Sequence, residues 1–309
     1  MWWKESKKQK QAISRVKYLI FIILTLNIRF AMKSSKTILN YYIDLDLKFN
    51  ELFLEVLNDF NENAVHNFRV NIKKQVAFFH LLDCIAPKFQ AFETQALFFR
   101  IFKKAGAIRK VHIEKNILTN KDLEIKVAPE IIQNLDKQLA KKVERFLQHD
   151  YAEDLKAINK KSKTIKRLIQ QVSRKNLNNG LNEYFRKLLH GLKKMSDSCK
   201  ASEDAFHDLR KLLKELFYNL FLINQLFEHN QLTTGVLKYL DRLQTSLGEW
   251  HDIHLTFKHF LALEKPEFEE MIEILKRKND EYVEKIRTQL IDFEAVLSEI
   301  ELELSVMVA

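Results

Sequence analysis

"HNFRVNIKK" (His66–Lys74) and "HDLRKLLKE" (His207–Glu215) both follow the pattern His-x-x-Arg-x-x-x-Lys, 141 residues apart in a chain of 309 residues. Helical residues advance by about 100° each, so the histidine, arginine and lysine of each copy fall within about 60° of one another. Each stretch is predicted to be an amphipathic helix with a cationic side next to an apolar side. The apolar sides carry Phe68, Ile72 and Phe79 in the first copy, and Leu209, Leu213, Leu216 and Leu220 in the second.

The composition of the whole chain favours helices throughout. Hydrophobic residues make up 46% of it, and only 5 glycines and 3 prolines interrupt them. Glycine and proline are the strongest helix breakers, and no run shows the period-two alternation and hairpin turns of a β-strand region. The predicted fold class is therefore all-α.

The repeat extends beyond the two motifs. Gly106 follows His66 by 40 residues, and Gly248 follows His207 by 41. An internal repeat of about 140 residues predicts two pseudo-symmetric antiparallel helical bundles of about four helices each, which form one domain. We expect the first bundle to span residues 32–125, and the second, with an acidic C-terminal helix, to span 126–309.

Glycine and proline also guide the expected helix ends. We expect helices to end at Gly106, at "NLNNG" (Asn176–Gly180) and at Gly248, and one long helix to cover about 130–160.

Residues 1–31 form a separate extension with two interpretations. Seven basic side chains surround "YLIFIILTL" (Tyr18–Leu26), which has the character of a signal peptide or membrane anchor. This apolar run is shorter than the roughly 20 residues of an ordinary spanning helix. Alternatively, translation begins at Met32, and the extension is a misassigned start.

The net charge of +10 is unevenly distributed along the chain. Residues 1–31 carry +6 (seven basic against one acidic) and residues 264–309 carry −7 (six against thirteen), which leaves +11 for residues 32–263. A basic body with an acidic tail indicates a polyanionic partner, although a solvated helical surface is the simpler interpretation of charge alone.

The three basic residue types of the motif suit an extended phosphate chain. Arginine can donate to two phosphate oxygens, lysine supplies a compact charge, and histidine adds a donor or a pH-dependent charge. A single copy could be an ordinary exposed helix face. Two copies at matched distances from a glycine favour a binding function, because a solvated face requires no fixed order of residue types.

A second basic element covers Lys156–Lys175, with eight basic residues and no acidic one. Four of its cations form one row at positions i, i+4, i+7 and i+11, namely Lys156, Lys160, Lys163 and Arg167. Like charges repel along a helix, so a bound polyanion would stabilise this one. A solvated linker helix is the alternative.

"VHNFRVNIKK" (Val65–Lys74) and "FHDLRKLLKE" (Phe206–Glu215) resemble the two motif helices of the CHAD family, the conserved histidine α-helical domains. The family pattern Gly-x-x-Arg-Asp follows each helix, here as "GAIRK" (Gly106–Lys110) and "GEWHD" (Gly248–Asp252). Lys110 replaces the acid in the first copy, and His251 replaces the arginine in the second. These departures predict a looser first site and a weaker or more pH-sensitive second site.

The resemblance implies two pseudo-symmetric four-helix bundles and binding of inorganic polyphosphate through a basic surface. We expect a cytoplasmic protein that could associate with polyphosphate granules, with no catalytic residue, metal or cofactor. The expected binding residues are His66, Arg69, Lys73, Lys74, Arg109, Lys156, Lys160, Lys163, Arg167, His207, Arg210, Lys211 and Lys214.

Nucleic-acid binding is the second choice, because the charge suits it. The sequence contains no recognition-helix or RNA-binding motif, and most of its phenylalanines lie at core spacing, among them Phe78, Phe79, Phe98, Phe99, Phe217 and Phe221. A metal-dependent phosphohydrolase at His207-Asp208 and His251-Asp252 is less favoured, because the first repeat has Asn67 in place of the first aspartate. A purely structural scaffold is the third choice.

Overall fold

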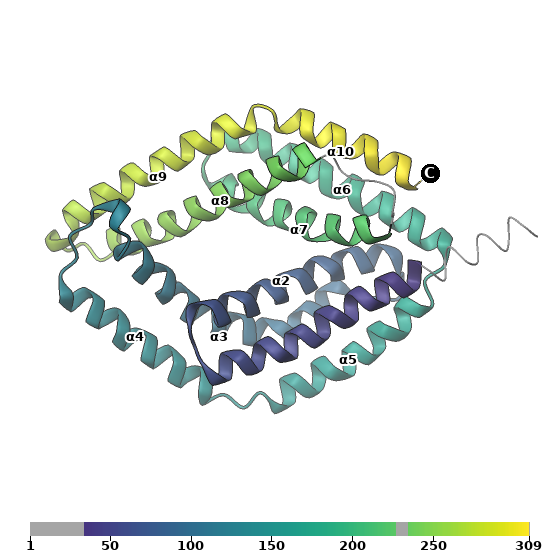
Figure 1. The fold of residues 1–309 in the computed structure, drawn as a ribbon, viewed down its shortest axis with the longest axis horizontal. Coiled ribbons are helices and arrows are strands. Elements are labelled where there is room, and N and C mark those ends of the chain that lie inside the picture. Colours follow the sequence, from purple (N-terminus) through teal and green to yellow (C-terminus); the bar gives the residue numbers. More distant parts are fainter. Residues whose placement is uncertain (1–33, 227–233, 309) are drawn as a thin grey trace, which may run out of the picture.

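The computed structural model describes residues 34–226 and 234–308, so the predicted extension over 1–31 lies outside the described residues. The described chain is helical and contains no β-strand, which confirms the all-α prediction. A first helix covers residues 34–58. It is followed by α2 (Glu62–Ile85), α3 (Ala91–Leu118), α4 (Pro129–Leu147), α5 (Ala152–Gln170), α6 (Arg174–Ala201), α7 (Asp204–Leu226), α8 (Thr234–Leu261), α9 (Glu269–Leu290) and α10 (Phe293–Val308), with short 3₁₀ turns at Lys121–Leu123 and Pro266–Phe268 (Figure 1).

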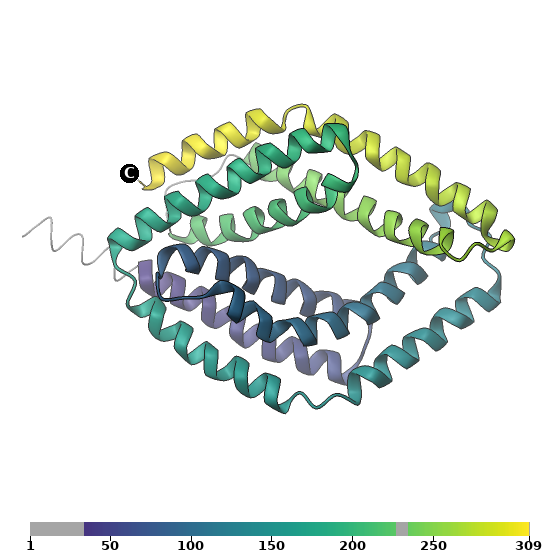
Figure 2. The same ribbon diagram turned by 180° about the vertical axis from the view of Figure 1, so that it is seen from behind.

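The helices form two layers (Figures 1 and 2). One layer contains residues 34–58 and α2 to α5, and the other contains α6 to α10. The layers meet where α2 packs against α6 and α7, and where α3 packs against α8. One continuous hydrophobic core runs through both layers, and a smaller cluster lies among α3, α4, α8 and α9. The two motif helices, α2 and α7, therefore lie at the interface between the layers.

Each layer of the described chain has five α-helices, close to the expected number of about four, and in the first layer the additional helix results from a break. The expected helix over 130–160 is interrupted between α4 and α5. Phe146 and Tyr151 flank the break and are both buried, with ring centroids 5.0 Å apart. The Asp150 carboxylate accepts a hydrogen bond from the backbone N–H of Ala152 at the start of α5. A turn thus replaces the helix, and it buries two aromatic rings.

The helices α4 and α5 pack against α3, in the first layer. The predicted division after residue 125 therefore separates helices that pack together. The pseudo-symmetry of the two layers stays a prediction.

All three expected helix ends at glycine are wrong, because α3, α6 and α8 run through Gly106, Gly180 and Gly248. Gly180 is buried where α6 crosses the end of α2. A Cβ atom at this position would lie 2.7 Å from the carbonyl carbon of Cys84 and 2.8 Å from the Cα of Ile85. Gly180 thus permits a close approach between two helix backbones and does not end a helix.

Gly180→Ala and Gly248→Ala are expected to change stability in opposite directions. The first inserts a methyl group into backbone contacts and should lower the free energy of unfolding by about 1–3 kcal/mol. A Cβ atom at Gly248 would meet nothing within 4 Å, so Gly248→Ala should gain helix propensity, up to about 1 kcal/mol. Thermal melts of both variants test this, and equal shifts would contradict the close approach at Gly180.

Candidate functional site: a cationic cluster between the two motif helices

The motif helices bury their apolar sides as predicted. Phe68 and Ile72 on α2, and Leu209 and Leu213 on α7, are almost completely inaccessible to solvent. The side chain of Asn61 caps α2 by accepting a hydrogen bond from the backbone N–H of Ala64. Burial of the apolar sides fixes the rotation of each helix, and with it the direction of the basic side chains.

The basic sides of the two helices face each other. Burial, then the charges of Lys214, Arg210 and Arg69, lower the pKa of Lys73 to about 7. Burial, then Arg210, lower the pKa of Lys214 to about 8. Both apolar sides pack into one core, which brings the cations of the two helices together.

Arg69 is held firmly against α3. Its Nη1 donates a hydrogen bond of 2.6 Å to the carbonyl oxygen of Phe102, and its guanidinium lies 3.9 Å from the centroid of the Phe102 ring. A Cβ atom at Gly106 would lie 2.5 Å from this Nη1, so the glycine makes room for the arginine. Burial, then the charges of Arg109 and Arg210, lower the pKa of Arg69 to about 10. Arg69 therefore joins α2 to α3 as well as contributing positive charge.

Glu62 positions the second arginine of the first repeat, a role that the sequence did not reveal. Arg109 donates a 2.5 Å hydrogen bond to the Glu62 carboxylate, which also accepts one from Asn116. Burial alone would raise the pKa of Glu62, but these two hydrogen bonds lower it overall. Lys110, which replaces the family's acid, lies 3.6 Å from Glu114 instead. Glu62 thus supplies a carboxylate that was expected to be missing from the first repeat.

Arg210 has a buried donor atom without a partner in the described part of the chain. Burial lowers its pKa and Asp252 opposes that effect. Its Nε is buried and, among the described residues, has no hydrogen-bond partner. A buried donor without a partner is uncommon and costly in a folded protein.

Two histidines stack at the edge of the site. The rings of His207 and His251 are 5.3 Å apart and nearly parallel, and His251 Nδ1 lies 3.2 Å from Asp252 Oδ1. Burial and, to a smaller extent, neighbouring positive charges lower the pKa of His66. Burial is also the largest cause of the lowered pKa values of His207 and His251. All three rings are therefore predominantly neutral at pH 7. We call the assembled residues the cationic cluster: His66, Arg69, Lys73, Arg109, His207, Arg210, Lys214 and His251.

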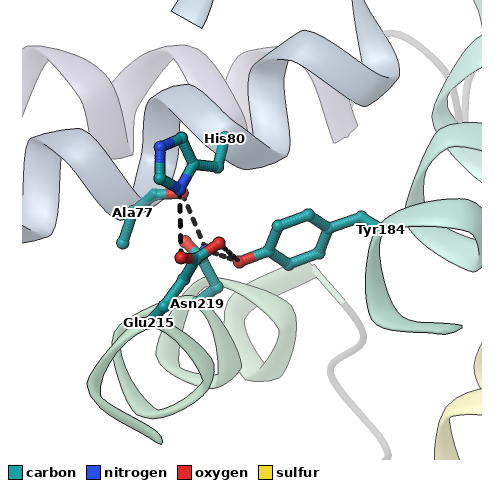
Figure 3. Close-up of polar contacts among 5 residues, drawn as sticks. All are labelled: Ala77, His80, Tyr184, Glu215 and Asn219. Carbon is teal, nitrogen blue, oxygen red and sulfur yellow. Dashed lines mark hydrogen bonds and ion pairs between the residues drawn. The ribbon is translucent and has the colours of Figure 1, made fainter. Parts of the chain in front are cut away.

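A polar network next to the cationic cluster sets the register of α2 against α7 (Figure 3). Glu215 lies 3.0 Å from Nδ1 of His80 and accepts a 2.9 Å hydrogen bond from the hydroxyl of Tyr184. Asn219 donates to the carbonyl oxygen of Ala77 and contacts the same hydroxyl. The hydrogen bond to Glu215 raises the pKa of His80. Glu215 thus interacts with His80 and Tyr184 rather than with the neighbouring Lys214, so it does not compensate the positive charge of the cluster.

Six predicted binding residues lie outside the cationic cluster. Lys74 lies 5.9 Å from the ring of Tyr218, and Lys211 forms an exposed ion pair with Asp208. The other four belong to a row on α5, a helix that lies at the outer edge of the first layer, away from α7 and α8 in both views (Figures 1 and 2). This row consists of Lys156, Lys160, Lys163 and Arg167, and all four are exposed.

Two of the phenylalanines expected in the core lie on the surface. Phe99 is 63% exposed and Phe221 is 62% exposed, whereas Phe78, Phe79 and Phe98 are buried as expected. Within the described parts of the chain, no group of three or more histidine, cysteine, aspartate or glutamate residues could hold a metal ion. None of the described helices is long and apolar enough to span a bilayer.

Comparison with known proteins identifies the arrangement. The chain is similar to the CHAD domain in a crystal structure from the plant Ricinus communis, with a TM-score of 0.58 and 18% sequence identity over 88% of this chain and 91% of that one. No curated protein matches the chain. The sequence model described as CHAD domain matches residues 48–260, more than two thirds of the chain, and includes both motif helices. The chain therefore belongs to the CHAD domain family.

Proposed function

We propose that the protein binds inorganic polyphosphate through the cationic cluster. One observation carries this proposal: three arginines and two lysines converge in a half-buried site where Glu62 and Asp252 are the principal acids. Burying like charges together is costly, as the lowered pKa values of both lysines show. A ligand that carries many closely spaced negative charges would remove that cost.

Polyphosphate fits this site better than a nucleic acid does. It is a thin unbranched chain with a negative charge on each repeating unit and no bases to accommodate. Single-stranded nucleic acids gain affinity by stacking bases on aromatic rings. The ring of Phe102 is already covered by the Arg69 guanidinium. Binding rather than catalysis, and an association with polyphosphate granules, form part of this proposal.

Competition under one set of salt conditions tests the proposal. Labelled long-chain polyphosphate should be displaced by unlabelled polyphosphate at far lower phosphate concentration than by duplex DNA or RNA. With five cations engaged, the logarithm of affinity should fall with the logarithm of salt concentration with a slope of about −3.5, by analogy with single-stranded nucleic acids. Equal displacement by RNA would favour the nucleic-acid alternative, and a flat salt response would exclude a polyanion site.

A further inference from the structure

The exposed row on α5 differs from the inward-facing part of the same helix in how its charges are paired. Lys166 faces the first helix and donates a 2.7 Å hydrogen bond to Asp46, which also accepts one from Ser162. Ile158, Ile165 and Ile169 pack into the core beside it. The four cations of the row form no ion pair with any described residue. The chain thus provides an acid for the structural lysine of α5 and none for the outward row.

The surface helix α9 provides an internal comparison. Three of its five cations form ion pairs: Lys278 with Glu281, Arg287 with Glu284, and Lys285 with Glu249. Pairs of like charge at i, i+3 and i+4 destabilise a helix by a few tenths of a kcal/mol each, and opposite pairs stabilise it by a similar amount. The row on α5 contains three consecutive pairs of like charge. No ion pair with a described residue offsets that cost in the row, whereas three cations of α9 are paired with carboxylates.

The row is also electrostatically separate from the cationic cluster. The charges that shift the pKa values of Lys73 and Lys214 come from α2, α7 and α8. Both views place α5 on the opposite side of the first helix and α2 from α7 (Figures 1 and 2). A short oligophosphate that fills the cluster would therefore leave the row free. The row spans 11 residues of helix, about 16 Å, which suits several units of an extended chain.

We propose that the row on α5 is a second polyanion-docking face, and that the protein uses it to cross-link polyphosphate chains: one chain occupies the cationic cluster and another lies along α5. This inference rests on the proposed function, and it extends the protein's role from holding one chain to joining several. The four exposed side chains offer positive charge but no shaped pocket. This face should therefore select ligands by their charge density and not by their chain ends.

A fourfold variant tests the second face. Lys156→Gln, Lys160→Gln, Lys163→Gln and Arg167→Gln together neutralise the row and preserve side-chain length and helix propensity. The matched control removes the same charge from α9 through Lys276→Gln, Arg277→Gln, Lys285→Gln and Arg287→Gln. Tripolyphosphate and long-chain polyphosphate are titrated into each protein, and light scattering is recorded across the ratio of polymer to protein.

The wild type and the α9 control should show scattering with long chains that rises and then falls as polymer becomes excess, and none with tripolyphosphate. The α5 variant should lose most of that scattering, because cross-linking needs both faces. Its affinity for tripolyphosphate should change less than twofold. Undiminished scattering in the α5 variant would overturn the second face. Lys73→Met should weaken tripolyphosphate binding and lose scattering with long chains, for the same reason. Scattering retained in Lys73→Met would also overturn the cross-link, whereas no tripolyphosphate binding in the wild type would remove the proposed function itself.

Discussion

Replacing Lys73 with methionine is expected to stabilise the ligand-free protein and to weaken polyphosphate binding. Burial and three neighbouring cations disfavour the ammonium group, so a neutral side chain of similar length that packs beside Phe102 should recover about 1–2 kcal/mol. For a chain of 309 residues this corresponds to a rise in melting temperature of about 1.5–3 °C at pH 6–7. Loss of one charge-assisted contact should weaken binding by about 1.5–3 kcal/mol, which is about 10- to 150-fold.

The control for Lys73→Met is Lys48→Met, which removes the same charge from an exposed ion pair with Glu51. Exposed pairs contribute little, so its melting temperature and affinity should stay close to those of the wild type. A lower melting temperature for Lys73→Met would show that the lysine supports the fold, and unchanged affinity would place the ligand elsewhere.

Polyphosphate binding is expected to take up protons, increasingly so above pH 7. A lysine whose pKa is lowered releases its proton in the free protein, and a bound polyanion restores it. With free-state pKa values of about 7 for Lys73 and about 8 for Lys214, uptake by these lysines should rise from about 0.1 proton at pH 6 to about 1.4 at pH 8. Affinity should accordingly fall as the pH rises, by about 25-fold per pH unit near pH 8.

Calorimetry in two buffers of different ionisation enthalpy measures this uptake, and two variants separate its sources. Lys73→Met should remove about 0.9 proton at pH 8. The double variant His66→Gln/His207→Gln should reduce uptake at lower pH than Lys73→Met does, because burial lowers the pKa of both imidazoles. Uptake that is greatest at pH 6 and absent at pH 8 would assign the coupling to the histidines and not to the lysines.

The same depressed pKa gives the free protein a pH-dependent stability. The unfolded chain binds more protons than the folded one between the folded pKa of Lys73, about 7, and its ordinary value of 10.5. The contribution of Lys73 to the free energy of unfolding therefore rises with pH across that window.

Helical periodicity predicted which side of each motif helix is buried, because Phe68 and Leu209 repeat at the spacing of one helix face. It could not show what a glycine does. Gly106 was expected to end a helix, and it makes room for an arginine of another helix. Glycine is both the usual residue after a helix end and the smallest residue at a helix crossing, and only the packing partner distinguishes the two.

The types and order of the site residues could be predicted from the sequence, but their burial could not. Lys73 and Lys214 come together because α2 and α7 meet in the register held by Glu215, Asn219 and Tyr184. Helical periodicity describes one helix at a time, so it could not predict the contact between Glu215 on α7 and His80 on α2. The row on α5 is the opposite case: its outward direction followed from periodicity, and its distance from the cluster depended on the packing of the first layer.

The most direct test of the cationic cluster is a site-resolved titration of the lysine side chains by NMR, with and without saturating polyphosphate. In the free protein, one lysine resonance should titrate near pH 7 and should be missing in Lys73→Met. With polyphosphate bound, its midpoint should move above pH 9, because the ligand supplies the negative charge that the site lacks. A resonance of Lys73 that titrates near the ordinary value of 10.5 in the free protein, or that does not move when polyphosphate is added, would contradict a buried cationic site completed by a polyanion.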